Sequence, residues 1–207
     1  VPKSLIFVIS LLKVISVLAS PLTMSEPTDD IIDLARFGDA IYGDPNDSVG
    51  RMVDEWSSSD SKMNPEELGS YFQGDILVPL EEGRNGLVKE STRWPNAVIP
   101  YNFHSSVPSN DRSTITRCIN EYHSKTCLKF VPRSSEYDYI EFQSQKTGCW
   151  SSVGRIGGKQ VINLQPGGCT SKIGTPCHEI MHALGFLHEQ NREDRDNHVR
   201  VLTQNIK

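Results

Sequence analysis

Residues 178–189, HEIMHALGFLHE, constrain the fold of this chain more than any other stretch. His178 and His182 are four residues apart, so on a helix they share one face with Cβ atoms about 5–6 Å apart, and both imidazoles can reach one metal ion. Gly185 can adopt a positive φ, end the helix and redirect the chain, so that His188 approaches the same ion. The segment therefore predicts a helix, a turn and a third ligand around one zinc ion.

Glu179 lies on the same helical turn as the first histidine but points away from the expected ion. This position suits a general base that acts on a zinc-bound water molecule. The alternative is that these residues are the polar side chains of an ordinary helix. HExxH alone arises by chance in a few per cent of chains of this length, and adding Gly185 and His188 lowers the chance to about one in ten thousand. The pattern favours a catalytic zinc site.

Residues 178–189 also match the HExxHxxGxxH pattern of the metzincin proteases, and the continuation as far as HEQNREDRDNHV resembles the astacin family. Other stretches resemble astacins in the same order: YFQGD, RWPNAVIPY, TCLKFVPR, GCWSSVGR and the region of Cys169. The resemblance covers about residues 65–207. It implies an α+β metzincin fold with a mixed twisted sheet and a zinc-binding helix. It also implies a secreted, extracellular zinc metalloendopeptidase that holds one zinc ion per chain and hydrolyses protein or peptide substrates.

Hydrophobic periodicity predicts the main elements of this α+β fold. Asn110 or Asp111 is expected to cap a helix whose apolar residues recur at i, i+3, i+4 and i+7, namely Ile115, Cys118, Ile119 and Tyr122. The best strand patterns are AVIPYNF, CLKFVP, YIEFQ with alternating sides, and VINLQ.

Residues 1–19 are expected to be a signal peptide. The run LIFVISLLKVISVL follows Lys3 and is apolar apart from Lys13 and its serines, and small residues after it favour cleavage behind Ala19. A membrane anchor is the alternative, which the shortness of the run and Lys13 disfavour. No stable membrane anchor is therefore expected after cleavage. The five cysteines fit disulfide formation in a secreted chain.

Residues 20–84 are expected to be a loosely ordered propeptide. Residues 21–84 carry fifteen acidic and four basic side chains, whereas residues 85–207 carry eleven acidic and fifteen basic ones. Stretches such as DPNDSVG and SSSDSKMNPEE predict at most short helices, of which DDIIDLARFGDA is one. An acidic leader fits a propeptide that covers a catalytic cleft, and a disordered linker is the alternative. With a net charge of −5, no nucleic-acid partner is expected.

The stretch YFQGD resembles the FxGD element of astacin propeptides, in which the aspartate ligates zinc and displaces the catalytic water. Here Phe72, Gly74 and Asp75 occupy these positions. A carboxylate is a suitable zinc ligand, and the neighbouring glycine lets the backbone pass close to the metal. The resemblance therefore implies that Asp75 is a zymogen zinc switch. The alternative is a simple Gly-Asp turn.

The resemblance also implies where the precursor is activated. A mature astacin-like chain would begin at Asn85, so Arg84 is the expected cleavage point for a trypsin-like protease. The new amino terminus would then pair with Glu189, the residue after the third histidine. For Glu189, an exposed charge at a helix end is the alternative. Residues 85–207 would form the N-terminal part of the catalytic domain.

An edge strand near GCWSSVG pairs with extended substrates in astacins. The resemblance therefore makes the main chain of four residues a candidate substrate strand, and these are Trp150, Ser151, Ser152 and Val153. Their side chains could instead serve packing alone.

The five cysteines are assigned partly by the same resemblance. It pairs Cys149 with Cys169 and leaves Cys127 unpaired here, because the family's partner for it lies further along the domain than Lys207. Cys118 and Cys177 remain as a candidate disulfide, which sequence alone does not fix.

The Met-turn of astacins and the tyrosine beyond it do not occur in this sequence. The expectation is therefore a precursor fragment whose catalytic domain lacks its C-terminal half. A truncated gene product and a non-catalytic secreted zinc-binding module are the alternatives. Glu179 disfavours the second, since a purely structural zinc site needs no base.

Overall fold

The computed structural model describes residues 44–59, 61–77, 92–191, 194–202 and 204. The expected signal peptide, the helix expected in DDIIDLARFGDA, and the expected cleavage residues Arg84 and Asn85 lie outside these ranges. Within the described ranges, no helix has the length and apolar character needed to cross a membrane.

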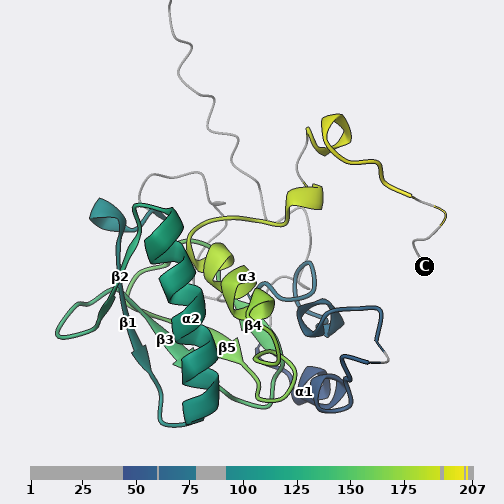
Figure 1. Ribbon diagram of the computed structural model, residues 1–207, viewed down its shortest axis with the longest axis horizontal. Coiled ribbons are helices and arrows are strands. Elements are labelled where there is room, and N and C mark those ends of the chain that lie inside the picture. The colour runs from purple at the N-terminus through teal and green to yellow at the C-terminus, as the bar shows by residue number, and fades with distance from the viewer. Residues whose placement is uncertain (1–43, 60, 78–91, 192–193, 203, 205–207) are drawn as a thin grey trace, which may run out of the picture.

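A mixed five-stranded sheet forms the centre of the molecule, with strand order β2-β1-β3-β5-β4 (Figure 1). Its strands are β1 Val98–Phe103, β2 Lys129–Pro132, β3 Tyr139–Gln143, β4 Cys149–Ser151 and β5 Lys159–Leu164. All neighbouring pairs run parallel except β4 and β5, which run antiparallel. β4 therefore forms one edge of the sheet, as the stretch GCWSSVG predicted.

Two helices lie side by side on one face of this sheet, α2 Ser109–Lys125 and α3 Gly174–Ala183 (Figure 1). Between helices and sheet lies a continuous apolar core that includes Ile99, Ile115, Cys118, Ile119, Ile140, Phe142, Ile162, Leu164 and Ile180. The short 3-10 helices are η3 Pro65–Leu68, η5 Pro95–Ala97, η6 Glu189–Asn191 and η7 Arg195–Asn197. Helices segregated to one face of a mixed sheet confirm the α+β prediction.

The start of α2 differs from the prediction. Pro108 occupies the N-cap, with φ −60° and ψ 153°, so neither Asn110 nor Asp111 caps the helix. The Arg112 amide donates to the Pro108 carbonyl at 3.0 Å, which places both polar residues inside the first turn. The ψ of 153° places Pro108 in the extended region, so the helix begins at the next residue, Ser109.

β3 has the predicted position but not the predicted alternation of exposed and buried sides. Glu141 is only 8% exposed, between the fully buried Ile140 and Phe142. β3 is the central strand and lies between β1 and β5. The Glu141 carboxylate accepts hydrogen bonds from Gln143 Nε2 at 2.8 Å and from Lys159 Nζ at 3.2 Å, so it is buried with partners.

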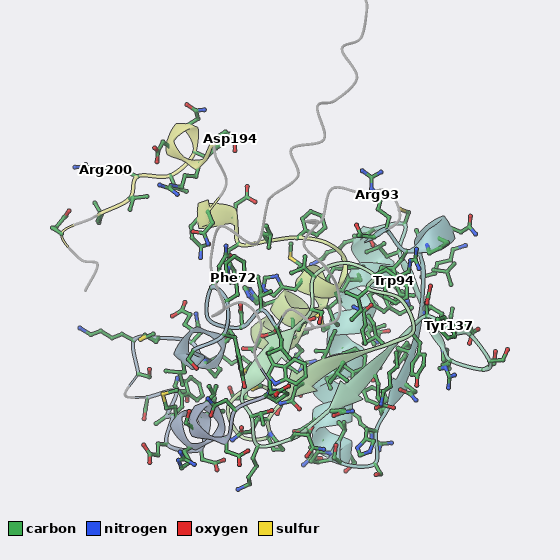
Figure 2. The ribbon with its side chains drawn as sticks, turned by 180° about the vertical axis from the view of Figure 1, so that it is seen from behind. Phe72, Arg93, Trp94, Tyr137, Asp194 and Arg200 are labelled. Carbon is green, nitrogen blue, oxygen red and sulfur yellow. A yellow bond between two sulfur atoms is a disulfide. The ribbon has the colours of Figure 1, made fainter. Side chains whose placement is uncertain are left out.

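Helix α3 is fastened at both ends by other parts of the same domain. At its start, a disulfide joins Cys177 to Cys118 of α2, and the Tyr122 hydroxyl donates to the Cys177 carbonyl at 2.8 Å. At its end, Trp94 Nε1 donates to the Ala183 carbonyl at 2.8 Å (Figure 2). These contacts fix the position of α3 relative to α2 and to the chain before β1.

The remaining cysteines have two different states. Cys149 and Cys169 form a disulfide with Cα atoms 5.6 Å apart, which ties β4 to the loop that follows β5. Cys127 is exposed and free.

A short helix, α1 Asp47–Asp54, forms within the segment predicted to be loosely ordered. The Asn46 side chain caps it by accepting from the Ser48 amide at 2.7 Å. Val49 and Val53 are buried on its inner side, at 0% and 2% exposure. Their burial against the rest of the chain stabilises an eight-residue helix that would be marginal alone.

Candidate metal centre

Helix α3 and the turn behind it bring the three histidines together. His178 and His182 lie one helical turn apart, and their Nε2 atoms are 3.0 Å from each other. The helix ends in a Schellman turn, in which Gly185 has φ 109° and its amide donates to the His182 carbonyl at 2.8 Å. The Phe186 amide donates a hydrogen bond to the Met181 carbonyl at 3.1 Å.

This turn returns the chain toward the helix face that carries the first two histidines. The Nε2 atom of His188 consequently lies 3.0 Å from that of His178. The positive φ needed for the turn is the reason why glycine suits position 185.

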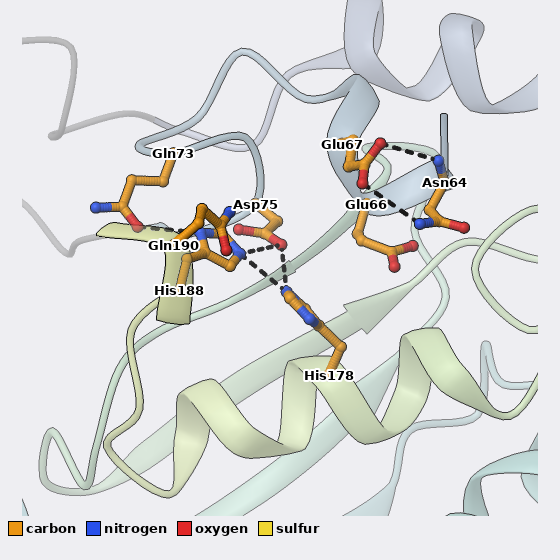
Figure 3. A pocket seen from close by; sticks show the side chains of 8 residues that line it. All are labelled: Asn64, Glu66, Glu67, Gln73, Asp75, His178, His188 and Gln190. Carbon is orange, nitrogen blue, oxygen red and sulfur yellow. Dashed lines mark hydrogen bonds and ion pairs between the residues drawn. The ribbon is translucent and has the colours of Figure 1, made fainter. Parts of the chain in front are cut away.

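Asp75, from the chain segment between η3 and the sheet, completes this cluster (Figure 3). Its Oδ2 lies 2.8 Å from His178 Nε2 and 3.3 Å from His188 Nε2, and its Oδ1 lies 3.5 Å from His182 Nε2. All four ligand atoms lie within 4.8 Å of one another. Tetrahedral zinc with ligands near 2.0–2.1 Å has neighbouring ligand atoms about 3.3 Å apart, so these four side chains fit one zinc ion.

Two further contacts orient the imidazoles. His182 Nδ1 lies 2.7 Å from the Phe186 carbonyl and His188 Nδ1 lies 3.0 Å from Gln73 Oε1, which are donor-to-acceptor contacts if each Nδ1 carries the proton. Each Nε2 then turns its lone pair toward the cluster, as a metal ligand must. Gln73 was not predicted from the sequence, although it lies inside YFQGD, and its φ of 54° reflects the tight path of the chain there.

Changing Gln73 to alanine is expected to weaken zinc binding by the full chain about ten- to hundredfold, because His188 loses the acceptor that orients its ring. Zinc affinity can be measured by competition with a chromophoric chelator. Gln190→Ala is the matched control, since Gln190 lines the same opening and makes no hydrogen bond to the histidines among the described residues. Equal losses in both variants would show that Gln73 has no orienting role.

Glu179 lies on α3 beside the cluster and is fully buried. Neither carboxylate oxygen has a hydrogen-bond partner among the described residues. Burial, with the nearby charges of Asp75 and Glu66, raises the pKa of Glu179 well above its usual value. For Asp75 burial acts in the same direction but is outweighed by hydrogen bonds to the histidines, so its pKa is lowered. The pKa values of the two carboxyl groups are therefore shifted in opposite directions.

The chain around Asp75 also occupies the sheet edge predicted to bind substrate. Ile76 bridges Ser151 in parallel orientation. The Ser151 amide donates to the Asp75 carbonyl at 3.0 Å, and the Leu77 amide donates to the Ser151 carbonyl at 3.0 Å. Ser152 Oγ adds a bond to the Leu77 carbonyl at 2.9 Å. Residues 75–77 thus pair with the edge of β4 through main-chain atoms, the kind of pairing by which an extended peptide can be added to a sheet.

All four residues of the predicted substrate strand are buried in this state, namely Trp150, Ser151, Ser152 and Val153. The Trp150 side chain packs in a small apolar cluster with Val49 and Tyr71, and its Nε1 donates to Thr147 Oγ1 at 3.1 Å. Its side chain therefore serves packing here, and the main chain of β4 is the part that pairs with another segment.

A solvent opening remains above the cluster (Figure 3). It is lined by Asn64, Glu66, Glu67, Gln73, Asp75, His178, His188 and Gln190. Glu66 Oε2 accepts a hydrogen bond from Thr175 Oγ1 at 2.8 Å, which holds η3 over the start of α3. The predicted amino-terminal partner, Glu189, is exposed in η6. Asn85, the residue expected to pair with it, lies outside the described residues.

Comparison with known families agrees with this arrangement. The model of the peptidase family described as "Astacin" matches residues 86–207. The chain belongs to the astacin family. The family resemblance inferred from the sequence is thereby confirmed, and with it zinc as the ion that fits the histidine and aspartate cluster.

Several relatives share long stretches with this astacin chain. It is 45% identical over 150 residues to zinc metalloproteinase nas-4 of Caenorhabditis elegans, covering 67% of this chain and 47% of that protein. It is 39% identical over 151 residues to high choriolytic enzyme 1 of Oryzias latipes, covering 70% and 54%. A solved structure of that hatching enzyme aligns with TM-score 0.49 and 43% identity, covering 56% of this chain and 57% of that one. The chain spans about half the length of these relatives.

Proposed function

We propose that this astacin chain is the latent precursor of a secreted zinc metalloendopeptidase. In this proposal residues 1–19 are a signal peptide, residues 20–84 a propeptide and residues 85–207 the N-terminal part of the catalytic domain. The observation that carries it is the meeting of three histidine Nε2 atoms and the Asp75 carboxylate within 4.8 Å. Two elements distant in sequence build this cluster.

In the active form His178, His182 and His188 would hold the metal, and departure of Asp75 would open the site to water. Bound zinc supplies a Lewis acid that lowers the pKa of water and polarises a peptide carbonyl. Glu179 accepts the proton of the attacking water on a carboxylate oxygen and passes it to the leaving amine. Its buried carboxylate, without a partner among the described residues, supports this role.

Latency has two parts in this proposal. Asp75 takes the fourth ligand position, and residues 75–77 pair with Ser151 on the edge strand. Protein or peptide substrates use the same main-chain groups, from Trp150 to Val153, once the propeptide has left. Two obstructions are therefore removed together on activation.

Activation is cleavage between Arg84 and Asn85 by a trypsin-like protease. The new amino group of Asn85 then pairs with Glu189 directly after the third zinc ligand. The disulfides of the domain and the expected signal peptide support secretion into an oxidising extracellular compartment.

The test is to treat the secreted full-length protein with trypsin and to follow hydrolysis of a quenched fluorescent peptide. Hydrolysis is expected to appear after the cut, to disappear with a zinc chelator and to return with added zinc. Arg84→Ala should prevent activation, whereas Arg51→Ala, a change of another basic propeptide residue, should not. Hydrolysis that is unaffected by the chelator, or full activation of the Arg84→Ala protein, would contradict the proposal.

A further inference from the structure

Helix α1 contacts the domain at a surface separate from the four metal ligands. This surface consists of residues 146–148 before β4 and residues 165–168 after β5, which the Cys149–Cys169 disulfide holds close together. Figure 1 shows α1 beside this end of the sheet, away from the C-terminal end of α3. The contacts made there involve neither Asp75 nor the histidines.

Three glycines allow the close approach of α1. A Cβ on Gly50 would lie 1.9 Å from the Lys146 carbonyl oxygen, and a Cβ on Gly148 would lie 2.5 Å from Val49 Cγ1. A Cβ on Gly168 would lie 2.5 Å from Val53 Cγ1. None of these gaps would admit a methyl group without movement.

Gly168 is the most informative of the three. Its φ lies outside the left-handed region that favours glycine, so its backbone conformation does not require this residue. The close contacts of its missing side chain are with Val53 Cγ1, the Val53 carbonyl and Pro65 Cβ, all in the propeptide. The side-chain size allowed at position 168 of the catalytic domain is therefore limited by a segment that activation would remove.

Gln165 adds polar recognition to this shape. The side chain is fully buried, and its Oε1 accepts from the Gly148 amide at 2.9 Å within the domain. Its Nε2 donates to the Gly50 carbonyl and to Asp54 Oδ1, both at 2.8 Å, on α1. The side-chain amide of Gln165 thus bonds within the domain through its oxygen and to helix α1 through its nitrogen.

Tyr71 makes a further contact between α1 and the domain. Its hydroxyl accepts from the Asn46 amide at 2.8 Å and donates to the Thr147 carbonyl at 2.8 Å. It therefore links the start of α1 to the domain. The ion pair of Lys146 and Asp54 at 3.2 Å is largely exposed and contributes little.

We propose that this surface holds residues 44–77 on the catalytic domain independently of Asp75, so that the propeptide stays bound after the chain is cut at Arg84. The bound propeptide is then a non-covalent inhibitor, and its dissociation is a second step of activation. This inference rests on the proposed protease function for its consequence, but the binding itself is independent of catalysis. The occupant of the surface is the chain's own helix α1.

The experiment uses the full chain with an affinity tag behind the signal peptide and a sequence-specific protease site in place of Arg84. After cutting, the tag is immobilised, and release of the catalytic domain is followed over time on gels. In an Asp75→Ala background the domain is expected to remain bound, because α1 still holds it. Adding Gly168→Ala is expected to speed release about tenfold or more, because the added methyl group overlaps Val53.

A second substitution separates this contact from general damage. Gly168→Ala should have a much smaller effect when Val53 is also alanine, because the overlapping methyl groups are then absent. Gly174→Ala is the matched control, since a Cβ there meets nothing within 4 Å. Its rate of domain release should stay within about twofold of that of the Asp75→Ala protein, well below the tenfold effect expected from an overpacked contact. If the Gly168→Ala chain is not secreted, Val53→Ala alone still tests the contact from the propeptide side and should accelerate release.

Immediate release from the cut Asp75→Ala protein, or an equal effect of Gly168→Ala in both Val53 backgrounds, would overturn the inference. Failure of the proposed protease function looks different. In that case peptide hydrolysis is absent even from the catalytic domain that has been released from the immobilised propeptide, while the release itself still follows the Val53 and Gly168 pattern.

Discussion

Replacing Glu179 by alanine is expected to lower peptide hydrolysis by the activated enzyme about 10³- to 10⁴-fold, the range for loss of a general acid-base group. Zinc should stay at one ion per chain, because Glu179 is not among the four clustered ligands. The carboxylate makes no hydrogen bond among the described residues, so its removal breaks no hydrogen bond there. The measurements are kcat on a fluorescent peptide and metal content by atomic absorption.

His182→Ala is the matched control, because it removes a ligand from the same helix. It should lose both zinc and activity. Glu179→Gln should resemble Glu179→Ala in rate while keeping the shape of the side chain. If Glu179→Ala lost as much zinc as His182→Ala, Glu179 would have to be assigned to metal binding instead of proton transfer.

Replacing Asp75 by alanine is expected to raise peptide hydrolysis by the uncut precursor at least about tenfold over that of the uncut wild type. The reason is that losing even about 1.4 kcal/mol of binding free energy between Asp75 and the metal corresponds to a tenfold change. The rate of the uncut variant should remain below that of the cut enzyme. The reason is that residues 75–77 can still pair with Ser151 through main-chain atoms, which the substitution does not remove. Both proteins are assayed in an Arg84→Ala background to prevent cleavage.

Asp44→Ala provides the control for loss of a propeptide carboxylate, because Asp44 is exposed and precedes α1. This substitution should not raise peptide hydrolysis by the uncut precursor. If the uncut Asp75→Ala precursor hydrolysed peptides no faster than the uncut wild type, steric covering of β4 would be sufficient to explain latency.

The histidine cluster could be predicted because its geometry is largely local. A spacing of four residues puts His178 and His182 on one helix face, and a glycine at position 185 permits the turn toward His188. The strands were also found at nearly their observed positions, since their apolar patterns are short and continuous. The fold class followed from these elements.

Features that depend on contacts between distant residues escaped prediction. Gln73 lies 115 positions from His188, whose ring it contacts, and Gln165 lies 115 positions from Gly50. Helix α1 has a polar sequence, and it forms because the domain offers a surface for its two valines. Glu141 breaks the expected alternation because only the assembled sheet supplies Lys159 beside it. Such partners have no signature in local sequence.

The fastening of α3 at both ends has a consequence for activation. Cys118, Tyr122 and Trp94 all lie outside the propeptide, so cutting the chain leaves every one of these attachments in place. The frame that carries His178 and His182 is therefore complete before the enzyme is switched on. In the proposed activation α3 thus keeps two metal ligands in place, while His188 loses its contact with Gln73, which leaves together with Asp75 and the covering strand.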